Sequence, residues 1–343
     1  MPVGIVGFGV YLPKFRIKVE EIAAYYKQDP NKIKSSLLIN EKSVAAKDED
    51  SATMSVQSSQ QALIMAEIDK SKIGSVYVGS ESHPYAVKPT ATIVGNALNL
   101  TNFYTAADFQ FACKSTTAAV YASLGLVASK YVEYALVIGA DKAQSKNGDI
   151  LEYCAGAGSV TWILGSNENE IVASIDKIVS FSTNTPDFWR RHGEDHPEYL
   201  GRFTGEPSYF FHITQTVDKI LQDAKMVPAD FDHVVFHQPN GAFPYSIAKK
   251  LGFVKKQIEL GLVAPHFGNC YSATTMIGVS AVLDQAKENQ KILVVSYGSG
   301  SGCDAMILTT TSNLSKKQNK SKTVQNFIDQ KEYIDYSTIL KWN

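Results

Sequence analysis

Four residues in separate parts of the chain have side chains that can do chemistry, and each stands where a strand ends or a helix begins. They are Glu81, Cys113, His237 and Asn269. Cys113 follows an apolar run and precedes small and hydroxyl residues, which predicts a thiol at the start of a helix. The unpaired amides and the positive dipole end there favour a thiolate nucleophile and an oxyanion site. A buried, inert thiol is an equally good interpretation of Cys113 alone.

The other three residues have complementary chemistry. His237 ends an apolar strand before the turn sequence QPNG, where an imidazole can exchange protons near neutral pH. Asn269 precedes a small-residue helix and could donate to an oxyanion or merely cap the helix. Glu81 follows the strand SVYVG, and a partly buried carboxylate there could act as a base. Each has an ordinary structural explanation, but their convergence at strand ends favours one site.

The elements that position these residues alternate between strand and helix patterns. This alternation predicts an α/β protein with a largely parallel sheet covered by helices on both faces. The alternation of strand and helix patterns starts again after Gly165, which suggests a duplicated fold with halves at 1–165 and 166–343. The expected strands are 3–10, 75–79, 104–111, 134–139, 171–179, 233–237, 291–297 and 305–310, and the main expected helices are 19–26, 52–68, 91–98, 115–129, 209–224, 244–251 and 272–285.

Composition excludes several classes of function. The 343 residues include 33 basic and 34 acidic side chains, a net charge of -1, so no overall field favours nucleic acid or an anionic membrane. The four cysteines form no CxxC pair, which argues against a zinc site and a disulfide scaffold. The apolar start resembles a strand rather than a signal peptide, and no apolar run approaches the roughly 18 residues of a membrane span, so we expect a cytoplasmic protein.

Four further stretches have distinct patterns. Residues 185–207 are rich in aromatic, charged and turn residues, which is typical of a long functional loop. Residues 313–322 are polar and lysine-rich and predict a solvated connector. The final YIDYSTILKW should dock on the body or on a partner.

The GSGSG run at 298–302 lacks the lysine and spacing of a phosphate-binding loop. We therefore expect its backbone to approach a thioester closely, with Ser299 as a contact, and we expect no cofactor.

A series of ordered motifs resembles the thiolase superfamily, and most closely the archaeal-type 3-hydroxy-3-methylglutaryl-CoA synthases. The motifs are GIVGFGVYLP, NEKSVAAKDEDSATMSV, VGSESHPYAVKPTATIVGNAL, FACKSTTAA, RFTGEPSYF, FHQPNG, GNCYSATTMIG, YGSGSG and YIDYSTILKW. The resemblance implies a thiolase-like duplicated fold with mixed sheets and layered helices. It also implies an acyltransferase of the mevalonate route to isoprenoids.

In the implied mechanism acetyl-CoA acylates Cys113, and Glu81 removes a proton from the acetyl methyl group. The carbanion attacks acetoacetyl-CoA, His237 protonates the alkoxide, and water releases the product. The resemblance further implies six residues around the substrate and coenzyme: Asp29, Cys154, Arg202, Thr204, Asn269 and Ser299. It implies a homodimer, and possible assembly with an acetoacetyl-CoA thiolase and a zinc-ribbon OB-fold protein.

The chain departs from the family pattern after HQPNG, where two basic residues usually help to hold the coenzyme. Here Ala242 and Ser246 take those places, and Lys249, Lys250 or the Arg190–Arg191 pair could substitute. An acyl group on a carrier protein is therefore an alternative to free CoA. A ketoacyl synthase III-like enzyme, which needs no Glu81, and a non-catalytic scaffold are two rival interpretations. A papain-like hydrolase fits neither Glu81 nor the repeated rhythm.

Overall fold

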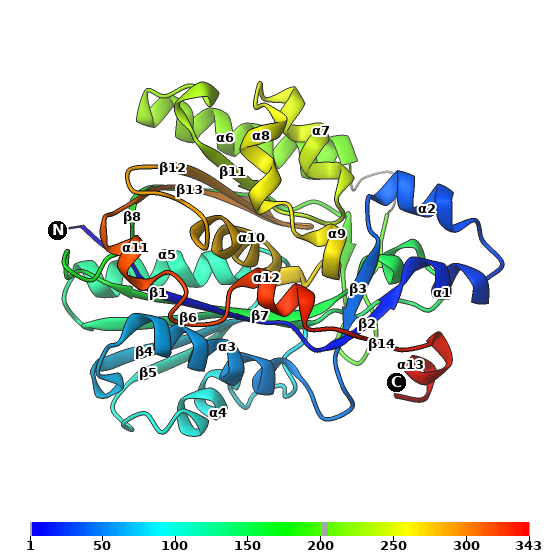
Figure 1. The fold of residues 1–343 in the computed structure, drawn as a ribbon, viewed down its shortest axis with the longest axis horizontal. Coiled ribbons are helices and arrows are strands. Elements are labelled where there is room, and N and C mark those ends of the chain that lie inside the picture. Colours follow the sequence, from blue (N-terminus) through cyan, green and yellow to red (C-terminus); the bar gives the residue numbers. More distant parts are fainter. Residues whose placement is uncertain (1, 201–204, 343) are drawn as a thin grey trace.

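A computed structural model describes residues 2–200 and 205–342, and it arranges them in alternating layers of helix and sheet (Figure 1). Two helices lie in the middle, between two parts of a nine-stranded sheet, and other helices cover the outer faces. The strands of this sheet are β1 (Gly4–Tyr11), β4 (Ile73–Gly79), β5 (Thr105–Phe109), β6 (Tyr134–Lys142), β7 (Ala157–Gly165), β8 (Ala173–Ser182), β11 (His233–Phe236), β12 (Lys291–Gly298) and β13 (Gly302–Thr310).

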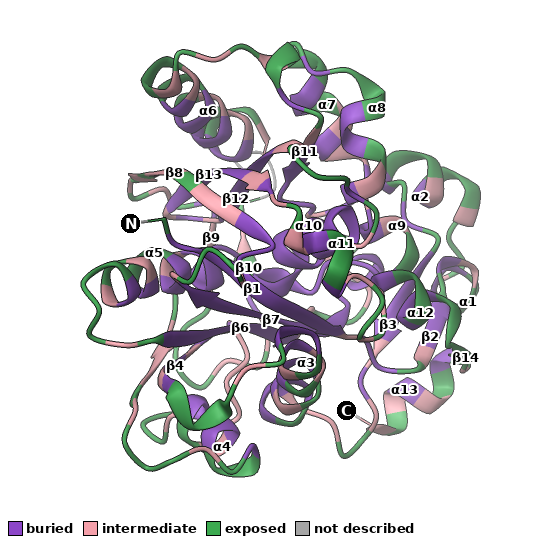
Figure 2. Cartoon of the chain, turned by 60° about the vertical axis from the view of Figure 1, so that its left-hand side comes forward, coloured by how far each residue is buried: buried purple, intermediate pink, exposed green. Residues whose placement is uncertain are grey.

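The central helices are α5 (Ser115–Ala128) and α10 (Thr274–Leu283). Every residue of α10 is buried, which its sequence TTMIGVSAVL allows because it has no charged side chain. Figure 2 shows buried strands inside the molecule and exposed residues along the outer helices. These outer helices are α3 (Ser51–Ala66), α4 (Thr90–Ala97), α6 (Phe211–Ala224), α7 (Ala242–Lys250) and α8 (Lys255–Ile258). Among the residues described, no helix is both long and apolar enough to cross a membrane.

The strand order repeats on the two sides of the β1–β8 contact. The order is β11-β12-β13-β8-β1-β7-β6-β4-β5. Outward from the β1–β8 contact, one side runs β8, β13, β12, β11 and the other runs β1, β7, β6, β4, with β5 added at that edge. On each side the first strand in sequence is followed by the last, the last but one and the second. β1 and β8 share only the pairs Gly4–Ser174 and Ile5–Ala173. Two related halves would produce this order, and the division at residue 165 stays a prediction.

The expectation of a largely parallel sheet was wrong. Within the nine-stranded sheet of the described residues, the β4–β5, β4–β6 and β11–β12 pairings are parallel, and the other five are antiparallel. A parallel neighbour requires a crossover helix, and no α-helix separates β6 from β7 or β12 from β13. The sequence analysis missed β7 altogether because this strand is buried on both faces and lacks alternation.

A smaller unit flanks the main sheet. Its three strands run in the order β14-β2-β3, where β14 is Glu332–Tyr333, β2 is Phe15–Lys18 and β3 is Glu41–Val44. The C-terminal segment therefore docks on the body, with the Trp342 ring 5.1 Å from that of Phe15. The remaining helices are α1 (Val19–Tyr25), α2 (Pro30–Leu37), α9 (Ala264–Phe267), α11 (Asn313–Lys317), α12 (Val324–Asp329) and α13 (Tyr336–Trp342).

The predicted solvated connector at 313–322 was also wrong, because it begins with the short helix α11 and buries Lys317. The Lys317 ammonium donates to the carbonyl oxygens of Val6 at 2.9 Å, Ala66 at 3.0 Å and Glu170 at 3.3 Å. Val6 lies at a register shift in the β1–β7 pairing. A lysine can thus satisfy a carbonyl that the irregular strand leaves without a ladder partner.

Replacing Lys317 with Met should lower the free energy of unfolding by about 2–4 kcal/mol, because buried carbonyl groups lose a charged donor. Urea denaturation measures this change. The matched control is Lys316→Met, since Lys316 is exposed and contacts only the Asn313 side chain among the described hydrogen bonds. Equal midpoints for the two variants would contradict the structural role of Lys317.

Candidate active site

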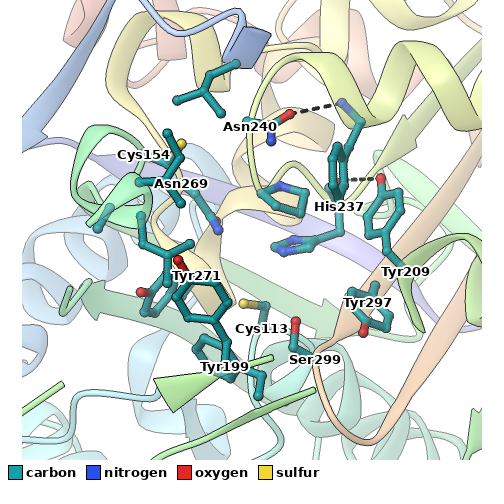
Figure 3. A pocket seen from close by; sticks show the side chains of 17 residues that line it. Cys113, Cys154, Tyr199, Tyr209, His237, Asn240, Asn269, Tyr271, Tyr297 and Ser299 are labelled. Atoms are coloured by element: carbon teal, nitrogen blue, oxygen red, sulfur yellow. Dashed lines mark hydrogen bonds between the residues drawn. The ribbon is translucent and has the colours of Figure 1, made fainter. Parts of the chain in front are cut away.

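A pocket of about 360 Å³ lies where the two parts of the main sheet and the flanking unit meet. Figure 3 shows Cys113, His237 and Asn269 around one open space, although they come from three distant parts of the sequence. The wall is mostly apolar and aromatic, as expected for a site that shields a reaction from water. The lining residues are Leu37, Cys113, Ile150, Leu151, Cys154, Ala155, Phe188, Tyr199, Tyr209, His237, Pro239, Asn240, Phe243, Asn269, Tyr271, Tyr297 and Ser299.

The Cys113 thiol is held in a tight turn between β5 and α5. Lys114 is the N-cap residue of α5, so the predicted position at a helix start is correct. Ala112 has a φ of +44°, which is unusual for a residue with a Cβ and costs free energy. Cys113 is only 4% exposed, but it borders the pocket and is not sealed in the core.

Glu81 meets Cys113 because their strands are parallel neighbours. Gly79, at the end of β4, pairs with Phe109, at the end of β5, and the two residues follow these ends. The Glu81 residue as a whole is partly exposed, but its Oε1 atom is buried and has no hydrogen-bond partner within the described part of the chain. Each of the two groups shifts the pKa of the other, so the carboxyl and the thiol are electrostatic neighbours, although Glu81 is not among the residues that line the pocket.

Asp141 fixes the loop that carries Glu81. Its Oδ1 accepts hydrogen bonds from the Glu81 amide at 2.8 Å and from the hydroxyls of Ser80 at 2.8 Å and Ser82 at 2.6 Å. Its Oδ2 accepts from the amide and hydroxyl of Ser272, at 2.9 and 2.6 Å. One buried carboxylate therefore joins the end of β6, the Glu81 loop and the segment before α10. Asp141 was not among the predicted site residues, although it lies near the end of an apolar strand.

The predicted Cys113 thiolate is corrected by the structure. Burial raises the pKa of Cys113 well above its ordinary value, and the neighbouring Glu81 charge raises it further. Burial likewise raises the pKa of Glu81 to about 8, with a further contribution from Asp141. Desolvation and negative neighbours outweigh the helix dipole, so the resting thiol is neutral at pH 7.

His237 and Asn269 face Cys113 from the second part of the sheet. Burial lowers the pKa of His237 to about 3, so its imidazole is neutral at pH 7. Its Nδ1 lies 3.4 Å from Thr275 Oγ1, which leaves Nε2 for the pocket. Asn269 is not a helix cap: its Oδ1 accepts from the Thr274 hydroxyl at 2.8 Å, which orients the amide NH2 as a donor. Two neutral donors can therefore stabilise a developing oxyanion.

The remaining predicted contacts divide into three groups. Cys154 and Ser299 line the pocket. Asp29 lies outside the pocket lining, at the exposed N-terminus of α2, where it caps the amide of Asn31 at 2.9 Å. Arg202 and Thr204 lie outside the described residues. Burial raises the pKa of Cys154 to about 12, so it contributes a neutral thiol.

Two of the candidate cation replacements, Arg190 and Lys250, are engaged in contacts of their own. Arg190 donates to the Glu81 carbonyl oxygen at 3.0 Å and to the Glu194 carbonyl oxygen at 3.1 Å. Lys250 pairs with Glu206 at 3.0 Å. Ser246 is exposed on α7 and donates to the Ala242 carbonyl oxygen at 3.2 Å.

Aromatic residues of the pocket wall were missed by the sequence analysis. The Tyr209 hydroxyl donates to the His237 carbonyl oxygen at 2.6 Å and so supports the strand end that carries the imidazole. Phe188 and Tyr199 come from the predicted loop at 185–207, which forms the short strands β9 (Phe188–Trp189) and β10 (Glu198–Tyr199). The π-helix Gly205–Phe210 includes the first two residues of the helix expected at 209–224, so α6 begins at Phe211. The aromatic density of this segment was the available signal.

Comparisons with known proteins find relatives along nearly the whole chain. A family model described as "Hydroxymethylglutaryl-coenzyme A synthase N terminal" matches residues 1–169, and one described as "3-Oxoacyl-[acyl-carrier-protein (ACP)] synthase III C terminal" matches residues 221–310. The hydroxymethylglutaryl-CoA synthase of Methanosarcina mazei is 50% identical over 337 residues, which cover 98% of this chain and 97% of that protein. The Methanocaldococcus jannaschii enzyme is 49% identical over 339 residues, which cover 99% and 98%.

Solved structures of low identity show the fold. A hydroxymethylglutaryl-CoA synthase complexed with CoA has a TM-score of 0.90 at 22% identity, over 99% of this chain and 90% of that one. The curacin-pathway HMG synthase complexed with an acetyl donor carrier protein has a TM-score of 0.89 at 19% identity, over 100% and 88%. A 3-oxoacyl synthase III of Pseudomonas aeruginosa has a TM-score of 0.83 at 17% identity, over 91% and 99%. These likenesses confirm the predicted thiolase-like fold.

The charge coupling between Glu81 and Cys113 predicts a specific pH response. Iodoacetamide should alkylate Cys113 slowly at pH 7, and faster as the pH rises through the raised pKa of the thiol. Glu81→Gln should lower that pKa, because it removes the negative charge that Glu81 carries above about pH 8. Alkylation at pH 9, followed by peptide mass spectrometry, should then be faster in the variant. Glu133→Gln, at an exposed carboxylate paired with Lys72, is the control and should leave the profile unchanged.

Proposed function

Because the chain belongs to the hydroxymethylglutaryl-CoA synthase family, we propose that it joins acetyl-CoA to acetoacetyl-CoA through an acetyl thioester on Cys113. Water is the third reactant, and 3-hydroxy-3-methylglutaryl-CoA is the product. One observation supports these roles above all: Glu81 and Cys113 follow the ends of the neighbouring parallel strands β4 and β5, and Cys113 borders the pocket. A base is thus next to the atom that would carry the acetyl group.

The first step forms the acetyl-enzyme. Cys113 Sγ attacks the carbonyl carbon of acetyl-CoA, and the Asn269 amide and His237 imidazole can donate to the oxyanion. The bond from that carbon to the coenzyme sulfur breaks, and the proton lost by Cys113 leaves on the coenzyme thiol. Acetylation also removes the titrating thiol beside Glu81.

The second step makes the nucleophilic carbon. Glu81 removes a proton from the acetyl methyl group, and the resulting electron pair is delocalised onto the thioester oxygen. A carboxyl group with a pKa of about 8 is a stronger base than an ordinary carboxylate, yet it is still partly ionised near neutral pH. Burial of Glu81 therefore suits it for this weakly acidic substrate.

The last steps form and release the product. The methyl carbon attacks the ketone carbon of acetoacetyl-CoA, and the new alkoxide takes up the proton that Glu81 removed from the methyl group, relayed by the His237 imidazole. Water then adds to the thioester carbon and the bond to Cys113 Sγ breaks, so that one proton of the water goes to Sγ, the other goes to solvent, and a free carboxylate is left. Every group used in these steps belongs to the chain itself, and we propose no cofactor beyond the CoA thioesters.

The same arrangement separates this function from its rivals. A decarboxylating ketoacyl synthase obtains its carbanion by loss of carbon dioxide and has no need of a carboxylate beside the nucleophile. A scaffold would need neither the coupled pair nor the pocket. Carrier-bound acyl groups stay a second candidate, because Ala242 and Ser246 supply no cation on α7. We further propose that Asp29, Arg202 and Thr204 help to bind the coenzyme.

Glu81→Ala should still accept acetyl on Cys113 but should lose condensation by about 10²- to 10⁴-fold, because the methyl proton has no base. The measurements are mass spectrometry of the peptide containing Cys113 after incubation with acetyl-CoA, and a steady-state assay with both CoA thioesters that follows thiol release and product mass. Glu133→Ala is the control and should turn over normally.

Two outcomes would contradict this function. Unchanged turnover of Glu81→Ala would remove Glu81 as the base. Absence of an acetyl adduct on Cys113 in the unmodified protein would favour a scaffold, or an enzyme that accepts acyl groups only from a carrier.

We also propose that the protein forms a homodimer through the edge strand β5. This strand is last in the sheet order, and large apolar side chains are exposed around it: Tyr85, Val87, Phe103 and Tyr121. Val87 is fully exposed with a φ of +71°, a strained conformation for a β-branched residue. An open strand edge with apolar neighbours is a surface that a second copy can cover.

Light scattering coupled to gel filtration should therefore give twice the 37.5 kDa mass of one chain. Phe103→Asp should shift the mass toward the monomer, because a charge enters the apolar surface, while Tyr25→Asp, at an exposed aromatic residue on α1, should not. A monomeric unmodified protein would exclude the dimer. Assembly with a thiolase and an OB-fold protein, and a cytoplasmic location consistent with four unpaired cysteines, stay predictions.

A further inference from the structure

A buried ion pair lies directly beside the nucleophile turn and joins the two parts of the main sheet. The Lys114 ammonium is 3.0 Å from Asp304 Oδ1 on β13, and the two side chains are 3% and 1% exposed. The second carboxylate oxygen accepts a hydrogen bond from the Thr117 hydroxyl at 2.7 Å. Lys114 follows Cys113 in the sequence, so this contact ties the start of α5 to a strand far away in the chain.

The same ammonium also contacts the other side of the turn. It lies 3.7 Å from the centre of the Phe111 ring, within the range of a cation–π interaction. The Lys114 amide donates to the Phe111 carbonyl oxygen at 3.2 Å. Residues 111 and 114 are therefore held together, and they enclose the strained Ala112 and Cys113. A strained backbone persists only where its surroundings hold it.

Close packing of β12 against this turn supports the same role. A Cβ on Gly298 would lie 2.6 Å from the Phe111 carbonyl oxygen and 2.8 Å from Lys114 Cγ, so only glycine allows this approach. The turn is thus bounded by Gly298 on one side and anchored to Asp304 on the next strand. Small movements here would shift Cys113 Sγ relative to Glu81 and His237.

Stability alone is a poor explanation for this ion pair. Removing two charges from water is costly, and apolar pairs of similar shape often replace a buried ion pair with little change in stability. An ammonium does what an apolar side chain cannot: it contacts the Asp304 carboxylate and the Phe111 ring in fixed directions. Its geometry is suited to holding a turn.

We propose that Lys114 and Asp304 are positioning residues, which hold the turn at Ala112 so that the Cys113 thiol stays between Glu81 and His237. This inference rests on the proposed role of Cys113 as the acetyl acceptor. Neither residue touches the substrate. Their effect on catalysis acts through the position of Sγ, and displacements of about 1 Å at a reacting atom can slow a reaction by about a hundredfold.

The test is the double variant Lys114→Met with Asp304→Leu, which removes both charges together and keeps the shapes of the side chains. The Thr117 hydroxyl keeps a partner, since it also donates to the Lys114 carbonyl oxygen at 3.0 Å. We expect acetylation of Cys113 by acetyl-CoA to slow by about 10- to 100-fold while the melting temperature stays close to that of the unmodified protein. The apparent pKa for alkylation of Cys113 should fall, because the thiol moves away from Glu81.

Thr117→Val is the second variant. It removes one hydrogen bond to Asp304 with almost no change in shape, and it should slow acetylation several-fold in the same direction even if the double variant does not fold. The matched control is Lys331→Met with Glu41→Leu, at an ion pair of 2.7 Å in the flanking unit, and its acetylation should be unchanged.

A folded double variant with a normal acetylation rate and an unchanged alkylation profile would overturn the proposal, and so would an unaffected Thr117→Val if the double variant is unfolded. Failure of the unmodified protein to take up acetyl on Cys113 is a separate result, which would instead overturn the proposed function.

Discussion

The site depends on two weak acids that share one desolvated space. Glu81 and Cys113 each influence the other's ionisation, and burial raises the pKa of both, so the pair resists carrying two negative charges at once. Acetylation would remove this conflict, because a thioester cannot ionise. The carboxyl group would then face a neutral acetyl group in a mostly apolar pocket, where a methyl proton can be removed without competition from the thiol.

The fold makes this contact possible through parallel strands and close packing. β4 and β5 end side by side, and the residues that follow them approach each other without any long-range adjustment. A Cβ on Gly79 would lie 2.5 Å from the Thr116 amide nitrogen, so the glycine lets the start of α5 press against the end of β4. Asp141 then fixes the Glu81 loop through its hydrogen bonds. Backbone geometry thus places the two groups, and hydrogen bonds hold them.

The sequence predicted the layered α/β fold and the positions of Cys113, His237 and Asn269 at strand ends or ahead of helices, because apolar runs, turn residues and small-residue helices are local signals. It did not predict the ionisation state of Cys113, since that depends first on the burial of the thiol in the folded chain and then on a carboxyl group 32 positions away. Nor did it reveal that Lys317 is buried, because a lysine-rich segment looks solvated unless the bulge that it caps is known. Contacts between distant segments carry information that local patterns lack.

The pocket wall is assembled from α2, the turn near Leu151, β10, α7 and β12, so a bound thioester would touch both parts of the sheet and the flanking unit at once. A ligand that contacts several units in the native state and none in the unfolded chain stabilises the native state by an amount that rises with the logarithm of the ligand concentration above its dissociation constant. The protein in a cell well supplied with its substrates would therefore resist heat and proteases better than the empty protein, and its abundance would follow the supply of acyl thioesters.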